Sequence, residues 1–67
     1  EAPVDSWRED GYPVDEFILI VEGQLRLIED DGSVLDLHAG DLGFVPQGWA
    51  GIWEVVEPVR KAYVVTS

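Results

Sequence analysis

The sequence contains no cysteine among its 67 residues. A disulfide is therefore excluded, and so is a metal site built on thiolates. A chain of this length makes one domain, and domains this small are only marginally able to bury a core. Without a covalent staple, we expect stability to come from strongly apolar strands, helped by association between copies.

Basic residues are scarce, because 4 Lys and Arg stand against 14 Asp and Glu and the formal net charge is −10. Nucleic acids and anionic membranes are bound through Lys and Arg, so we expect neither as a partner. The charge alone would suggest disorder, but a hydrophobic content of 46% argues for a folded domain.

Long apolar runs are also missing, and none approaches the roughly 20 residues that a membrane helix requires. Residues 1–5 carry no basic stretch followed by an apolar run, so no signal peptide is expected. The chain does not begin with Met, and we take it to be a processed or trimmed form. The default expectation for its location is the cytoplasm.

Short apolar runs separated by turn residues fill the chain after residue 15. Phe17–Val21 is continuous and rich in β-branched residues, which predicts a strand buried on both faces. Glu22 and Gly23 then predict a tight turn that returns residues 24–28 as a hairpin partner. Further strands are predicted over 34–37, 42–45, 52–56 and 60–65, with the last two forming a pair.

The first 15 residues are polar and are interrupted by Pro3, Gly11 and Pro13. We therefore expect residues 1–15 to form an extended arm that lies on a single domain over residues 16–67. No period of 3.6 residues persists beyond one turn. The pattern predicts an all-β fold in which short strands form a small barrel or a sandwich of two sheets.

Two spacings go beyond a generic β pattern. Glu16 is followed after six residues by Gly23, and Gly40 is followed after five residues by Pro46 and then by Gly48. This arrangement resembles the paired motifs of the cupin superfamily. The resemblance covers roughly residues 11–65 and implies a cupin-type small β-barrel, a double-stranded jelly roll of short antiparallel strands.

A narrower resemblance lies in residues 48–55 and 57–63. These stretches are similar to the cupins grouped with (S)-ureidoglycine aminohydrolase, a group in which many members have no assigned activity. The resemblance therefore implies the fold more than the reaction.

The histidines of a metal-binding cupin are absent. Such cupins carry two histidines before the motif acid and a third after the second motif. Counted onto this sequence, the near position falls on Gly11 or Tyr12, the far one on residues 9–10, and the third on Gly51. The one histidine, His38, lies elsewhere. Because imidazole is what suits a transition metal in an oxygen-ligand site, we expect no such cofactor.

The motif position of Glu16 implies that its side chain points into the barrel, and a buried carboxylate needs a partner, for which Lys61 is the obvious candidate. Period-two alternation places Trp53 on the same inner face as Gly51. We predict a ligand-binding pocket, and Glu16 and Lys61 are also the candidates for acid–base catalysis. The predicted lining is Tyr12, Glu16, Trp49, Trp53, Lys61 and Tyr63.

Three functions stay open at this point: a cupin that binds a small polar metabolite, an enzyme like ureidoglycine aminohydrolase acting on a small nitrogenous compound, and a structural module whose barrel is filled by Trp53. All three share the expectation of a homodimer, since the core is small and the strand at Phe17–Val21 is apolar on both faces.

Smaller features each have two readings. The acidic residues 29–31 suit either a solvated hairpin turn or calcium. Asp10, Asp15 and Glu16 could form a carboxylate-only metal site with Tyr12. His38 is a pH-sensitive group or an ordinary turn residue, and Trp49 is a stacking platform or a core side chain.

Overall fold

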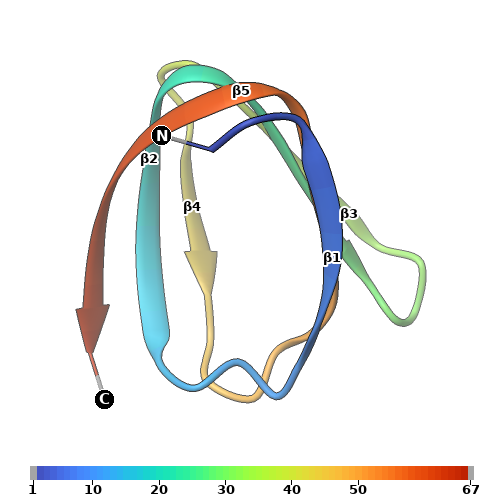
Figure 1. Ribbon diagram of the computed structural model, residues 1–67. Coiled ribbons are helices and arrows are strands. Elements are labelled where there is room, and N and C mark those ends of the chain that lie inside the picture. The colour runs from blue at the N-terminus through green and yellow to red at the C-terminus, as the bar shows by residue number, and fades with distance from the viewer. Residues whose placement is uncertain (1, 67) are drawn as a thin grey trace.

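The computed structural model describes residues 2–66 as five strands, with no helix among the described residues and so none there that could cross a membrane (Figure 1). The all-β prediction is confirmed. The strands are β1 (Asp5–Asp10), β2 (Asp15–Glu29), β3 (Val34–His38), β4 (Leu42–Val45) and β5 (Ala50–Thr66).

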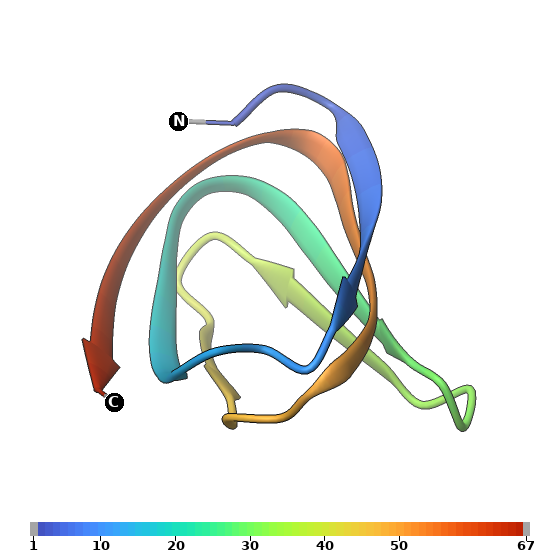
Figure 2. The same cartoon turned by 60° about the horizontal axis from the view of Figure 1, so that its bottom comes forward.

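All strand pairs are antiparallel, and the order across the sheet is β1-β5-β2-β3, with β4 also paired to β2. β2 and β5 are long, and they follow a shared curve side by side in both views (Figures 1 and 2). Each contributes to two half-sheets. The first half-sheet comprises β1, residues 50–57 of β5, residues 24–29 of β2, and β3; the second comprises β4, residues 15–20 of β2, and residues 61–66 of β5.

The predicted tight turn at Glu22 and Gly23 is wrong, because β2 runs through both residues without reversing. The register between β2 and β5 shifts around Gly23, which has a φ of 88°. A Cβ at Gly23 would lie 2.1 Å from the carbonyl oxygen of Pro58. The glycine therefore allows β2 to bulge and to approach the bend of β5, a role that local sequence cannot separate from a turn.

Two other boundaries differ from the prediction. Residues 50–66 form one strand that bends past Pro58, so the expected last pair of strands consists of two parts of β5. Residues 5–10 of the expected arm form β1, which pairs with β5 from Asp5 opposite Val55 to Asp10 opposite Ala50. The arm is extended as expected, but it is part of the sheet, and Ala2 adds a bridge to Val59.

The core lies inside the curve of β2 and β5. In β2 the buried and exposed side chains alternate, with Ile18 and Ile20 buried while Phe17 and Leu19 are 48% and 42% exposed. The prediction that this strand is buried on both faces is therefore wrong within the described chain. The buried hydrophobic residues are Ile18, Ile20, Leu25, Leu27, Leu37, Val45, Trp49, Trp53, Val55 and Val59.

Candidate functional site

Glu16 is the one buried charged residue of the described chain, with only 3% of its surface exposed. It lies near the start of β2, on the face that Ile18 and Ile20 share, which is where its motif position placed it. Its neighbours across the sheet are Val45 of β4 and Val65 of β5. A carboxylate in such a setting needs hydrogen-bond donors, because leaving it unpaired in an apolar environment is costly.

Two donors meet this need. The hydroxyl of Tyr12 donates to Oε1 of Glu16, and Nζ of Lys61 donates to Oε2 at 3.2 Å. Tyr12 precedes β2 in a loop held by backbone hydrogen bonds to Trp49 and Gly48. Lys61 lies opposite Ile20 on β5 and therefore faces the inside. The polar cluster thus joins a loop and two strands around one carboxylate.

Burial raises the pKa of Tyr12 well above its ordinary value of 10.0, and the hydrogen bond and negative charge of Glu16 add to the effect. The phenol therefore stays protonated throughout the physiological range, where it acts as a fixed donor. A charged ammonium and a neutral phenol then hold Glu16 in one orientation.

Trp53 forms the apolar floor beside this cluster. Its ring stacks against Trp7, at a centroid distance of 5.9 Å, and against Tyr12, at 5.5 Å. The ammonium of Lys61 lies 4.9 Å from the centroid of the same ring, within the range of a cation–π interaction. Nε1 of Trp53 is buried and has no hydrogen-bond partner among the described residues, which is an uncommon state for an indole N–H.

A small hollow of about 50 Å³ opens next to these groups. Trp7, Trp53 and Lys61 line one part of it, and the remainder is aliphatic, with Ala2, Leu25, Val55 and Val59. Its size suits a few non-hydrogen atoms, well below the 300–1,000 Å³ typical of sites for drug-sized ligands. Most of the barrel interior is filled by side chains.

The predicted lining divides into two groups. Tyr12, Glu16, Trp53 and Lys61 come together as one cluster. Tyr63 has the inward parity of its partner Ile18 but is 61% exposed, and its link to the cluster is the Lys61 ammonium, 5.4 Å from its ring centroid.

Trp49 lies apart from the cluster, in the barrel wall. It is 8% exposed, and its Nε1 donates to Glu29 at 3.1 Å, so it serves as a core side chain. Trp7 lies within the arm expected over residues 1–15, and the structure places it in the cluster. Its period-two register in β1, opposite Trp53, was the signal that could have identified it.

The positions that correspond to the missing histidines are engaged in other contacts. A Cβ at Gly51 would lie 2.2 Å from the carbonyl oxygen of Ile28 and 2.8 Å from the ring of Trp49, so no imidazole fits there. Glu9 accepts a hydrogen bond from Trp7, and Asp10 accepts one from Arg8. No group of three or more His, Cys, Asp or Glu that could hold a metal ion occurs in residues 2–66.

The carboxylates of Asp15, Asp30 and Asp31 each accept hydrogen bonds from nearby groups. Asp30 receives two hydrogen bonds from Arg8, both at 2.9 Å, and Asp31 accepts from the amide of Ser33. Both contacts hold the pKa of the respective carboxyl group below its ordinary value. Asp15 accepts from the amide of Gln47 at 2.7 Å, which stabilises the turn after β4. These groups therefore fasten loops and strand ends.

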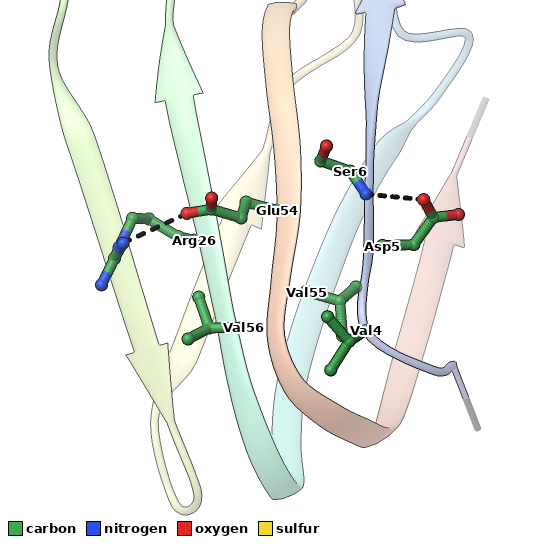
Figure 3. Close-up of a pocket in the computed structure, with 7 residues that line it drawn as sticks. All are labelled: Val4, Asp5, Ser6, Arg26, Glu54, Val55 and Val56. Carbon is green, nitrogen blue, oxygen red and sulfur yellow. Dashed lines mark hydrogen bonds and ion pairs between the residues drawn. The ribbon is translucent and has the colours of Figure 1, made fainter.

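A larger hollow, of about 410 Å³, lies on the outer side of the first half-sheet (Figure 3). Its charged groups are already engaged, since Arg26 donates to Glu54 at 3.1 Å and Asp5 accepts from the amide of Ser6. It contains no buried polar side chain that lacks a partner. The cluster around Glu16 is the better candidate for a functional site.

Comparison with known proteins identifies the fold. The model of the EutQ-like cupin domain matches residues 6–63. Similar solved structures include a DUF861 family protein from Thermotoga maritima, with 30% identity and a TM-score of 0.77, and the EutQ protein of Clostridium difficile, with 25% identity and a TM-score of 0.84. A protein of unknown function (DUF1255) from Acidithiobacillus ferrooxidans is 25% identical with a TM-score of 0.80.

The chain is aligned over 94% of its length in each of these three comparisons. It covers 78% of the Thermotoga protein but only 48% of the Clostridium protein and 58% of the Acidithiobacillus protein. No curated protein matches the sequence.

Proposed function

We propose that this chain, which belongs to the EutQ-like cupin domain family, binds a small polar metabolite beside Glu16, with Lys61 as its principal contact. The observation that carries the proposal is the buried Glu16 carboxylate, held by Tyr12 and by Lys61, which itself lines a small hollow together with Trp53. A purely structural core of this size has no need of a buried charge, because well-packed apolar residues do as well or better.

The chemistry of the cluster selects the ligand. Lys61 carries three N–H donors, one of which is used by Glu16, and 29% of its side chain is exposed and can be reached from solvent. Donors in this arrangement favour a ligand with an acceptor group such as a carboxylate or a ureide carbonyl.

The volume of the hollow limits how much of the ligand is enclosed. The lining of this hollow of about 50 Å³ is almost wholly apolar, so it suits a small apolar part of the ligand, while the acceptor group contacts Lys61 and the rest of the molecule lies outside the barrel. The partly exposed ring of Trp7, which stacks on Trp53, offers a flat apolar surface for the part that extends outward.

A thermal-shift screen with small carboxylates, amines, ureides and sugar acids tests the proposal. We expect at least one of them to raise the Tm of the wild-type chain, and titration calorimetry of that compound to give saturable binding. Lys61→Met should lose the shift, measured relative to the unliganded variant. Arg60→Gln is the matched control. Arg60 is the neighbouring base along β5, but its side chain points away from the cluster and pairs with Glu22 of β2.

Two results would contradict binding at this cluster: no compound of these classes shifts the Tm, or Lys61→Met retains the full shift. In the first case the filled interior, with Trp53 only 3% exposed, favours the structural module over the binding protein.

Catalysis is a second candidate, because a carboxylate and an ammonium in contact at 3.2 Å can exchange a proton. The resemblance to the cupins grouped with (S)-ureidoglycine aminohydrolase suggests a small nitrogenous compound as substrate. Release of ammonia from ureides by the wild-type chain, abolished in Glu16→Gln, would support this candidate. A ligand that binds but is not converted would contradict catalysis and favour the binding function.

A further inference from the structure

Another hollow, of about 150 Å³, lies between β3 and β4. These two strands follow one another along the chain but form no ladder within the described residues, and they diverge from the turn that joins them (Figures 1 and 2). The hollow shares no lining residue with the one beside Lys61. We call it the β3–β4 hollow, and the argument below uses five of its lining residues: Glu29, Val34, Leu35, Phe44 and Trp49.

The walls of the β3–β4 hollow are apolar and open to solvent. Val34 and Leu35 of β3 are 54% and 41% exposed, and Phe44 of β4 is 44% exposed. The buried side chains of Leu27 and Trp49 close the inner side. An apolar cavity of about 150 Å³ holds a molecule of the size of benzene, so this volume suits one ring or a branched chain of similar size.

Glu29 is the one charged residue of the lining in the described part of the chain, and it is held in place. Nε1 of Trp49 donates to its Oε1 at 3.1 Å, and its own amide donates to the carbonyl oxygen of Ser33 at 2.8 Å. The carboxylate is therefore fixed at the wall before a ligand arrives, which lowers the entropy cost of binding.

No base of the described chain neutralises Glu29. The 4 Lys and Arg residues of the sequence all pair with other acids. Arg8, which lies one row away across β5, donates to Asp10 and Asp30. Since the net charge of the chain is −10, its surroundings add to the negative potential, and the hollow attracts a cation and repels an anion.

We propose that the β3–β4 hollow binds a small organic amine whose ammonium group contacts Glu29. Trp49 uses Oε1 of this carboxylate, so Oε2 can accept a charge-assisted hydrogen bond from the ammonium. The apolar body of the ligand, about the size of one ring, then packs against Val34, Leu35 and Phe44. The ring of Phe44 adds aromatic or cation–π contact.

This ligand differs in chemistry from the one proposed for the cluster around Glu16. Lys61 donates and selects an acceptor group, whereas Glu29 accepts and selects a donor. A metal ion is the weaker occupant, because the walls are apolar and the described residues contain no group of three or more His, Cys, Asp or Glu that could hold one.

Titration of the isotope-labelled chain with benzylamine, followed by NMR, tests the proposal. We expect saturable binding with a Kd on the order of 1 mM for a ligand this small. The indole N–H resonance of Trp49 should shift, because its acceptor Glu29 takes the ammonium, while that of Trp7, which donates to Glu9, should stay in place. Benzyl alcohol, which has the same ring and no charge, should bind at least about 5-fold more weakly. Phenylacetate should leave the Trp49 resonance unshifted.

Glu29→Gln keeps an acceptor for Trp49 but removes the charge, and it should raise the Kd for benzylamine about 5- to 10-fold. Glu57→Gln is the matched control, because it removes an exposed carboxylate outside the hollow and changes the net charge equally. It should change the Kd by less than about twofold, since distant surface charges are screened. Lys61→Met should also leave the Kd unchanged. If circular dichroism shows that Glu29→Gln is unfolded, Val34→Lys replaces it, because an ammonium at this exposed wall repels the ligand.

Four results would overturn the proposal. Benzylamine gives no saturable shift of Trp49, or benzyl alcohol binds as tightly, which would make the hollow an apolar site without selection for charge. The folded Glu29 or Val34 variant retains the wild-type Kd, or Lys61→Met abolishes the Trp49 shift, which would assign the amine to the cluster around Glu16.

Discussion

The contact between Glu16 and Lys61 can be measured as a coupling free energy. Lys61→Met keeps an unbranched side chain over the ring of Trp53 but removes the ammonium 3.2 Å from the carboxylate. Breaking a fully buried pair costs about 3–5 kcal/mol. Because 29% of the Lys61 side chain is exposed, water can replace part of the lost interaction. We therefore expect Lys61→Met to lower the free energy of unfolding by about 2 kcal/mol.

Glu16→Gln probes the other partner. The amide keeps the size of the side chain, and its oxygen can still accept from Tyr12, so we expect a loss of about 1–2 kcal/mol. In the double variant neither charge is left without its partner. The sum of the two single losses should therefore exceed the loss of the double variant by about 1–2 kcal/mol.

Urea unfolding followed by tryptophan fluorescence gives the four free energies of unfolding at one fixed protein concentration, which matters if the chain associates. Arg60→Gln serves as the reference, since its partner Glu22 is largely exposed and a surface pair contributes little. A coupling no larger than about 0.3 kcal/mol, within the additivity error of distant sites, would refute the reasoning that this pair is a buried, energetically significant contact.

Two further perturbations follow from the site and the fold. Because folding raises the pKa of Tyr12, the folded state holds its proton more tightly, and stability should fall as pH rises above 10. Tyr12→Phe should flatten that fall in urea midpoints measured across this range. Gly51→Ala should lower the free energy of unfolding by about 3 kcal/mol or more, because the added Cβ would collide with the backbone at Ile28. At Gly48 the added Cβ meets open space, so Gly48→Ala should lower it by only about 1–2 kcal/mol through backbone strain. A stable Gly51→Ala chain in thermal melts would show that the two strands can separate there.

Much of the inner face could be predicted from the sequence. The motif position of Glu16 implied that its side chain points inward, and the alternation of side chains applied from Gly51 placed Trp53 inside. Alternation alone did not decide which side of the last strand is inner, and the choice of Lys61 as partner rested on the narrower cupin resemblance.

The rest depended on contacts between distant residues. Gly23 is equally compatible with a tight turn and with a bulge, and only its approach to Pro58 decides between them. Tyr63 has the correct parity, but its exposure depends on whether a neighbouring strand covers it. Trp49 precedes its strand, where period-two alternation gives no direction for the side chain.

The position of β5 in the sheet has a consequence for how the domain is made. β5 comes last along the chain, yet it lies between β1 and β2 and pairs with β2 along most of its length. During synthesis β1 therefore has no partner until more than 40 further residues have been translated. The nascent chain exposes its apolar strands during that interval, so we expect the barrel to close slowly and only after its final strand has left the ribosome.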